Sequence, residues 1–415
     1  METPSPHGEV SISELKARLH EKDRVEQFLR AEVKELWFYI KNFENDPFLK
    51  LYLKIKTGIA KKILSVFKFA KKTIQSPDLD KSANLKKINE RCEILLVLPS
   101  DKIEIGGLVS ATKFINELSA EGYSVKKVSL SHDPSANLTN DIDVVKNIDE
   151  LVQSKLVLAC GAETVRFVQD YARKHNNKSI LLMQGPDPFF TPRFEDSRYF
   201  LENLSKFNSV IAYSPYLEKL ARFWGAVNVT TAVFGPDEKV FVLNNLIPRL
   251  NQIVVPCRFP TEKGIRILLP SLSKLRQLGW KLIGFGDLPD LAMSNYFDDF
   301  VGRITPTETS RLFQESKIII DPSLIEGLGL TTLEAAKCGC VPIIQKRGGF
   351  EDMFDSNKLP FIEIDNFLNP QLLLDAVNQS QVALNPLLVN ERVSEINWNN
   401  GLRIAKNEIK QLLKS

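Results

Sequence analysis

Four charged residues in the second half of the chain have the types and spacing that a phosphate-bearing ligand needs. Arg258 and Lys263 lie five residues apart just after an apolar run. A planar guanidinium and a point-like ammonium can together bind a diphosphate. Glu326 and Glu334 have seven residues between them, and carboxylates suit hydroxyl groups rather than phosphates. The set therefore fits a ligand that combines phosphate with sugar hydroxyls.

Solvated surface charges are the simpler interpretation of the two cations. Arginine and lysine are unfavourable beside a helix start unless an anion is present, because the amino end of a helix is itself positive. The spacing of Arg258 and Lys263 ahead of a predicted helix therefore favours an anion site.

The elements that must position the two glutamates can be read along residues 317–349. Residues 318–320 predict a buried strand, a glycine-spaced turn follows at 326–330, a helix is expected over 331–337, and 341–344 form the next strand. Such a strand–turn–helix unit presents main-chain N–H groups at the carboxyl edge of a parallel sheet, where phosphates bind. The alternative is that Gly327 and Gly329 only permit a tight turn.

The stretch from about 301 to 349 also resembles the donor-site signature of retaining GT-B glycosyltransferases of the sucrose-synthase and mannosyltransferase type, family four. The resemblance lies in Glu326, seven residues and Glu334, preceded by Pro322-Ser323 and followed by the sequence Glu-Ala-Ala-x-Cys-Gly. It implies an α/β fold of the GT-B kind, with two facing doubly wound Rossmann-like domains and a helical extension at the front. It also implies transfer of a hexose or deoxyhexose from a nucleotide-diphosphate sugar to a hydroxyl, with retention and without a metal or other cofactor.

The resemblance also assigns roles to individual residues. Arg258 and Lys263 would stabilise the diphosphate, Glu326 would hold the donor sugar and Glu334 the ribose. The catalytic set is Arg258, Lys263 and Glu326, and the donor-binding set is Gly106, Gly107, Arg303, Ile304, Gly327, Leu328, Gly329, Leu330, Thr331 and Glu334. Cys257 stands where the family usually has glycine.

The loop from Gln184 to Arg193 is rich in proline and aromatic residues, which suit a stiff wall around an acceptor. Many family members carry a histidine near here, and this loop has none, since His175 lies upstream. The loop is loosely similar to that of bacterial rhamnosyltransferases that build surface glycans, which implies a role in bacterial surface polysaccharide synthesis. Asp187 would then bind acceptor or sugar hydroxyls, and its alternative role is to cap a helix.

Two other functions remain open. The missing histidine favours a non-catalytic glycosyltransferase-like scaffold of a glycan-assembly complex, although Arg258, Lys263, Glu326 and Glu334 are all present. A sugar-nucleotide epimerase on the same architecture would interconvert donors without an acceptor.

The length of 415 residues allows two domains and an extension. We expect a helical extension over 1–90, an acceptor domain over 91–250, a nucleotide-sugar domain over 251–385, and helices over 386–415 that cross back to the first domain. Apolar runs predict strands in the acceptor domain at 93–98, 125–130, 155–160, 179–183 and 209–212.

The basic excess of the chain lies in its front segment. Residues 1–90 hold 18 Lys and Arg against 13 Asp and Glu, and the remainder holds 36 against 38, which does not indicate a nucleic-acid-binding surface. Residues 48–74 form a basic amphipathic pattern without any acidic residue, typical of peripheral contact with an anionic membrane. Residues 11–43 predict a coiled coil or helical arm for self-association or partner docking. Packing of either segment on the body of the protein is the alternative.

Other features place the chain at the cytoplasmic side of a membrane. Five scattered cysteines are typical of reduced thiols, and no signal peptide or spanning segment is evident. No metal is expected: Cys338-Gly-Cys340 lacks a second ligand pair, and Asp141-Ile142-Asp143 reads as an ordinary loop and strand edge rather than a metal motif. His132 has no assigned role.

Overall fold

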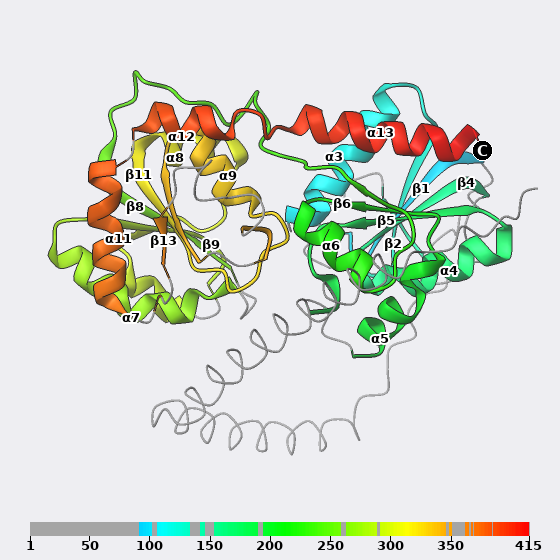
Figure 1. The fold of residues 1–415 in the computed structure, drawn as a ribbon, viewed down its shortest axis with the longest axis horizontal. Coiled ribbons are helices and arrows are strands. Elements are labelled where there is room, and N and C mark those ends of the chain that lie inside the picture. Colours follow the sequence, from blue (N-terminus) through cyan, green and yellow to red (C-terminus); the bar gives the residue numbers. More distant parts are fainter. Residues whose placement is uncertain are drawn as a thin grey trace, which may run out of the picture. The chain divides into compact units, whose positions relative to one another are not determined.

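The computed structural model describes residues 91–101, 106–132, 142–145, 153–189, 194–258, 263–288, 291–345, 348–350, 362–364, 367, 369–383 and 385–414. These residues form two parallel β-sheets with helices packed around them (Figure 1). The predicted segments 11–43 and 48–74, and Asp141, lie outside the described residues.

The first sheet has the order β3-β2-β1-β4-β5-β6-β7, with every neighbouring pair parallel. Its strands are β1 (Cys92–Leu98), β2 (Val125–Ser129), β3 (Ile142–Val144), β4 (Ser154–Cys160), β5 (Lys178–Met183), β6 (Ser209–Ala212) and β7 (Val229–Thr231). The chain runs outward from β1 to β3 and then returns to β4. This reversal is the doubly wound pattern, and its switch point lies between β1 and β4.

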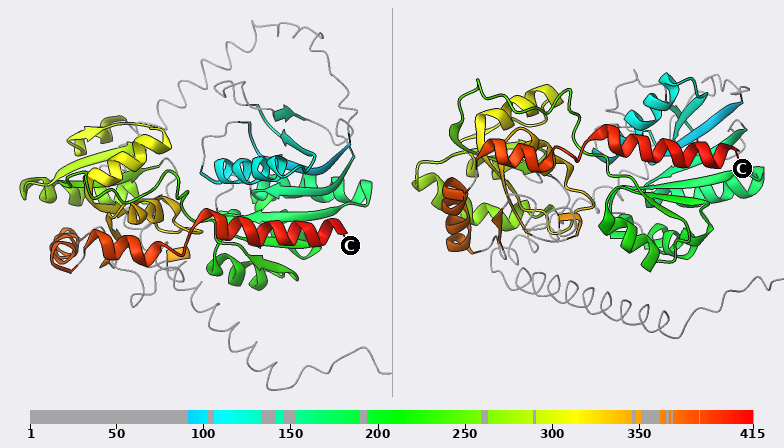
Figure 2. Two further views of the ribbon diagram at one scale, coloured as in Figure 1. Left: turned by 90° about the horizontal axis from the view of Figure 1, so that it is seen from above. Right: turned by 45° about the horizontal axis from the view of Figure 1, so that its top comes forward.

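The helices of this region follow the strands in alternation. They are α3 (Gly106–Ala120), α4 (Ala162–His175), α5 (Phe194–Asn203) and α6 (Pro215–Phe223), with short 3₁₀ turns η2 (Asp187–Phe189) and η3 (Leu204–Lys206). The final helix α13 (Trp398–Lys414) also belongs here: both views show it lying along this sheet (Figure 2), and its apolar side packs into the core of the sheet. The buried residues of α13 in that core are Trp398, Leu402, Ala405 and Ile409.

The second sheet repeats the same plan with the order β10-β9-β8-β11-β12-β13, again all parallel. Its strands are β8 (Leu250–Cys257), β9 (Lys281–Gly286), β10 (Asp299–Phe300), β11 (Ser316–Asp321), β12 (Val341–Ile344) and β13 (Ile362–Glu363). Its helices are α7 (Ile265–Gln277), α8 (Pro306–Glu315), α9 (Leu330–Lys337), α11 (Pro370–Ala383) and α12 (Pro386–Val393), with the 3₁₀ turn η5 (Leu291–Tyr296). The switch point lies between β8 and β11.

The predicted α/β fold with two doubly wound domains is confirmed. The apolar runs become central strands because both faces of a parallel sheet are covered by helices, so nearly every residue is apolar. In β1 and β4 all but one residue is buried. The short strands β7, β10 and β13 were not predicted, because two or three residues do not make a recognisable run. Of β3, only a strand edge at Ile142 and Asp143 was expected.

Candidate active site

Lys263 and Arg258 both bind the carboxylate of Glu326. Lys263 Nζ lies 2.7 Å from Glu326 Oε1, and Arg258 Nη1 lies 3.4 Å from the same oxygen. Arg258 follows β8 and Glu326 follows β11, so the cluster sits at the carboxyl ends of the two strands that flank the switch point. In open parallel sheets this is where ligands bind. Three of the residues singled out from the sequence therefore meet in space.

Glu326 is held as a buried anion. The side chain of Lys263 is 12% exposed and that of Glu326 8%. Burial alone would raise the pKa of Glu326, but the charges of Lys263 and Arg258 and the hydrogen bonds from Lys263 and Ser323 outweigh it, so the pKa lies below its usual value. The two cations thus already have an anionic oxygen between them, the same chemistry that a phosphate oxygen would offer.

A close backbone contact places Lys263 beside Glu326. Gly264 has a φ of +67°, and a Cβ at this position would stand 1.9 Å from the carbonyl oxygen of Pro322. Only glycine can take this conformation with the loop after β11 so near. The loop that carries Lys263 is therefore pressed directly against the loop that leads to Glu326.

The glycine turn ends in a helix start without a side-chain cap. Gly329, with a φ of +74°, is the N-cap of α9 and makes no side-chain cap hydrogen bond. The first N–H groups of a helix need partners from outside it, and an anion is a suitable one. Arg258 also donates through Nη2 to the hydroxyl of Thr331 in the first turn. The turn predicted to supply main-chain donors thus lies next to Arg258, with Leu328 buried and Leu330 half-buried.

Asp321 and Thr332, which were not predicted as site residues, organise this turn together with Ser323. Buried Asp321 accepts hydrogen bonds at Oδ1 from Ser323 Oγ (2.6 Å) and at Oδ2 from Thr332 Oγ1 (2.8 Å). Ser323 in turn lies 3.0 Å from Glu326 Oε1. The signal that could have found them is an acidic residue that ends an apolar strand, because a buried carboxylate must be hydrogen-bonded.

Glu334 lies in α9 in a different electrostatic setting. Burial raises its pKa to about 8, the nearby Asp237 adds to the rise, and the charges of Arg258 and Lys113 oppose it. Lys113 binds Asp237 with Nζ to Oδ2 at 2.6 Å. Glu334 therefore shares Arg258 as a neighbour with Glu326, yet at neutral pH it holds a proton, while Glu326 is ionised.

This difference gives a testable pH dependence of stability. The folded chain favours the protonated Glu334, so its contribution to stability is present below the ordinary pKa of 4.5 and is lost as the pH rises towards 8. Glu334→Gln removes that loss. Between pH 5 and pH 8.5 we expect its melting temperature to gain on the wild type by about 2–4 °C for each ~1 kcal/mol of that loss, and one unit of pKa rise corresponds to ~1.4 kcal/mol. If the melting temperatures of the two proteins changed equally with pH over this range, the burial of Glu334 would be contradicted.

Loops of the first sheet contact the glycine turn. A Cβ on Gly327 would stand 2.2 Å from the carbonyl oxygen of Gln184, and Ser214 Oγ donates to the carbonyl of Gly327 at 2.5 Å. A Cβ on Gly107 would stand 2.3 Å from Gln184 Oε1, whereas one on Gly106 would meet nothing within 4 Å. Gly107 therefore reaches this region through Gln184. Gln184 and Ser214 were not predicted as site residues.

Asp187 opens the 3₁₀ turn η2 two residues after Gly185. Burial raises its pKa well above the usual value, the charge of Glu163 adds to the rise, and a backbone hydrogen bond from Gly185 opposes it. Its Oδ2 is buried and has no hydrogen-bond partner among the described residues. The acceptor-binding role of Asp187 stays a prediction.

Arg303 and Ile304 lie on the loop after β10. Arg303 is exposed, and its Nε donates to both carboxylate oxygens of Asp287, at 2.7 Å and 2.9 Å. Gly286 N donates to Gly302 O at 2.7 Å, and Asp287 N donates to Cys257 O at 2.9 Å. The loop predicted to hold a base is thus connected, through Asp287, to the strand end that carries Arg258.

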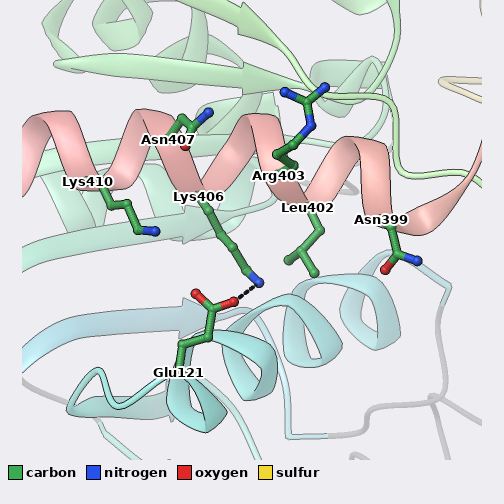
Figure 3. Close-up of a pocket in the computed structure, with 7 residues that line it drawn as sticks. All are labelled: Glu121, Asn399, Leu402, Arg403, Lys406, Asn407 and Lys410. Atoms are coloured by element: carbon green, nitrogen blue, oxygen red, sulfur yellow. Dashed lines mark hydrogen bonds and ion pairs between the residues drawn. The ribbon is translucent and has the colours of Figure 1, made fainter.

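A separate hollow of about 330 Å³ lies between α13 and α3 (Figure 3). It is lined by Glu121, Asn399, Leu402, Arg403, Lys406, Asn407 and Lys410, and Lys406 points to Glu121 across it. None of the residues predicted to bind donor or acceptor lines this hollow.

Metal-binding clusters and membrane-spanning helices are absent from the described part of the chain. In it, His, Cys, Asp and Glu side chains do not gather in any group of three or more suited to a metal ion. The helices within the same ranges include none with the length and apolar character needed to cross a bilayer. All five cysteines are buried free thiols.

Comparison with known proteins supports the fold described above. Residues 241–380, which run from before β8 into α11, match the family model of glycosyl transferases group 1. A glycogen synthase from Clostridium perfringens is 25% identical over 193 residues, which cover 40% of this chain and 39% of that enzyme. The chain thus aligns with about two fifths of the length of that curated relative.

Solved structures resemble the chain over a longer stretch. Sucrose-phosphate synthase from Thermosynechococcus elongatus matches with a TM-score of 0.63 at 16% identity, over 78% of this chain and all of that one. HepE from Anabaena in complex with UDP matches with a TM-score of 0.64 at 13% identity, over 77% of this chain and all of that one. The described chain therefore has the GT-B fold of glycosyltransferases, and its residues 241–380 match the group 1 glycosyl transferases.

Proposed function

We propose that the chain is a retaining glycosyltransferase that moves a hexose or deoxyhexose from a nucleotide-diphosphate sugar to a hydroxyl of a glycan or glycolipid in bacterial surface polysaccharide synthesis. The observation that carries the proposal is the pairing of Lys263 and Arg258 on one oxygen of Glu326, beside the uncapped start of α9. Two cations converge there on one buried anion, and Arg258 also bonds to Thr331 in the first turn of α9.

The donor diphosphate takes the place of that anion in the proposal. Lys263 and Arg258 turn from Glu326 to the phosphate oxygens, and the N–H groups of the Gly327 to Thr331 turn add main-chain donors. As the bond from the anomeric carbon to the phosphate oxygen breaks, negative charge grows on the leaving diphosphate. Donors that are already in place then stabilise the transition state more than the ground state.

The remaining groups bind hydroxyls. Glu326, released from Lys263, accepts hydrogen bonds from the donor sugar, and Glu334 binds the ribose. The acceptor oxygen forms its bond to the anomeric carbon on the same face from which the leaving group departs. The proton of the acceptor hydroxyl passes to the leaving phosphate oxygen. These steps use positive charge from the protein's own side chains and include no metal or other cofactor.

A ligand screen tests the proposal. The structurally similar HepE was solved with UDP and with UDP-glucose, so UDP is the first probe, followed by GDP, ADP and dTDP and then their sugars. A ligand at 100 times its Kd raises the stability of the folded chain by about 2.7 kcal/mol. We expect one nucleoside diphosphate to raise the melting temperature, and its sugar to be transferred to a glycan or glycolipid acceptor. Binding without turnover would instead favour a scaffold, and interconversion of donors without an acceptor an epimerase.

Membrane contact through residues 48–74 remains a prediction from the sequence. Reversing two charges in that segment, Lys61→Glu with Lys62→Glu, is expected to reduce sedimentation with anionic vesicles, because each basic residue near the surface contributes about 1 kcal/mol. A matched control reverses two exposed lysines of the second sheet region, Lys274 and Lys281. Equal binding by both double variants would rule out the segment as the membrane contact. Docking through residues 11–43 likewise remains a prediction.

A further inference from the structure

An aspartate–histidine pair lies at the carboxyl edge of the first sheet. His132 Nδ1 is 2.6 Å from Asp101 Oδ2. Asp101 follows β1, which flanks the switch point of this sheet, and His132 follows the neighbouring strand β2. The last paired residues of these strands are Leu98 and Ser129, so both side chains come from the loops immediately beyond the ladder.

The two loops are joined independently of this pair. Ser131 Oγ donates to Pro99 O at 2.7 Å, and Ser129 Oγ donates to Ser131 O at 3.1 Å. The backbone adds bonds from Leu130 N to Leu98 O and from Asp101 N to Ser131 O. The loops therefore do not need the histidine ring to stay together, and the pair calls for a role other than closing them.

The chemistry of the pair is that of an oriented hydrogen-bond acceptor. The Asp101 side chain is 10% exposed and that of His132 is 48% exposed. A carboxylate that accepts from Nδ1–H fixes the tautomer in which Nε2 carries a lone pair. Among the described residues no side chain or backbone group bonds to His132 Nε2. The ring thus offers a fixed acceptor to a hydroxyl at the sheet edge where ligands bind.

The second described histidine lies elsewhere. His175 is in the last turn of α4, at the amino edge of the same sheet, where its ring packs on Tyr171 with centroids 4.6 Å apart. His132 is therefore the histidine that the described residues place at the ligand edge. Its partner Asp101 comes after β1 and precedes Gly106 and Gly107, which begin α3.

We infer that Asp101 and His132 orient the acceptor: His132 Nε2 accepts a hydrogen bond from a hydroxyl of a sugar acceptor, and Asp101 positions the ring. This inference rests on the proposed function and adds a specificity-determining residue on the acceptor side. The bound hydroxyl is one that does not react, so the proton of the reacting hydroxyl still passes to the leaving phosphate.

Histidine-selective NMR tests the contact directly. The chain has four histidines, and the His132 signal is assigned as the one lost in His132→Ala. The probes are octyl glucoside, galactoside, mannoside and N-acetylglucosaminide below their micelle concentrations, with the nucleoside diphosphate bound. We expect at least one glycoside to move the His132 signal and to leave the His175 signal in place. A panel that leaves the His132 signal unmoved overturns the inference.

Kinetics with the glycoside that moves the His132 signal distinguish acceptor binding by His132 from a structural role of the two loops. His132→Ala is expected to raise the KM for that glycoside about 10-fold, the effect of one hydrogen bond, without changing the Kd for the nucleoside diphosphate or the rate of donor hydrolysis by water. Asp101→Ala should raise the same KM, and Asp101→Asn, which keeps an oxygen for Nδ1–H, should restore it.

Ser131→Ala is the matched control, since it removes a bond between the two loops and leaves the ring untouched. An equal rise in KM for Ser131→Ala, or no rise for His132→Ala, overturns the inference. If the wild type bound none of the nucleoside diphosphates, the proposed function would be contradicted instead. The two failures are therefore distinguishable.

Discussion

Replacement of Lys263 by alanine is expected to lower kcat by about 10²–10³-fold, the effect of removing one positioned donor from a developing negative charge. Lys263 Nζ lies 2.7 Å from Glu326 and its loop is held by the contact of Gly264 with Pro322. The ammonium therefore stands where the leaving phosphate would bind. Initial rates of transfer from the donor identified in the ligand screen measure the effect.

The same replacement leaves the buried Glu326 with only the longer contact to Arg258 at 3.4 Å. The stability of the Lys263→Ala protein must therefore be measured beside its activity. Removing one partner of a buried ion pair costs up to about 3–5 kcal/mol. The double variant Lys263→Ala with Glu326→Gln removes both charges and should recover most of that stability, yet stay inactive. Lys274→Ala, on the exposed side of α7, is the matched control. Near-normal kcat in a folded Lys263→Ala protein would contradict the assigned role.

Replacement of Gly327 by alanine is expected to reduce both stability and turnover. The new methyl group would stand 2.2 Å from Gln184 O and 2.9 Å from the Cα of Gly185. Because both neighbours are backbone atoms, the turn must move, at a cost of about 1–3 kcal/mol typical of overpacking. The movement would also break the bond from Ser214 Oγ to Gly327 O. Thermal melting and transfer rates measure the two effects.

Gly106→Ala provides the comparison for stability, since its Cβ would meet no atom within 4 Å. If Gly327→Ala melts at the same temperature as Gly106→Ala and turns over at the wild-type rate, the contact between the loop after β5 and the glycine turn does not exist in solution.

The fold was predictable because parallel strands and glycine turns leave local signals. The run Ile318 to Ile320, the turn from Glu326 and the helix up to Lys337 occur in the structure nearly as expected, with the helix starting at Leu330. Each follows from apolar content or from glycine within a few residues. Short edge strands such as β10, with two residues, carry too little pattern to be recognised.

The sequence indicated which residues form the site, but it did not indicate how their side chains contact one another. The types of Arg258, Lys263 and Glu326 indicated phosphate and hydroxyl chemistry, but not that one carboxylate oxygen receives both cations. The bond from Ser214 to Gly327 joins residues 113 positions apart, and no local pattern reports such a contact. The opposite pKa shifts of Glu326 and Glu334 depend on burial and on neighbours from other segments, such as Lys113 and Asp237, which the sequence alone does not bring together.

A crystal structure of the chain with its nucleoside diphosphate bound would show whether Lys263 and Arg258 bind the diphosphate. We expect Lys263 Nζ and Arg258 to leave Glu326 and to lie within hydrogen-bond distance of the terminal phosphate, with the start of α9 facing the same group and Glu334 on the ribose. A diphosphate bound elsewhere, with Lys263 still paired to Glu326, would contradict it.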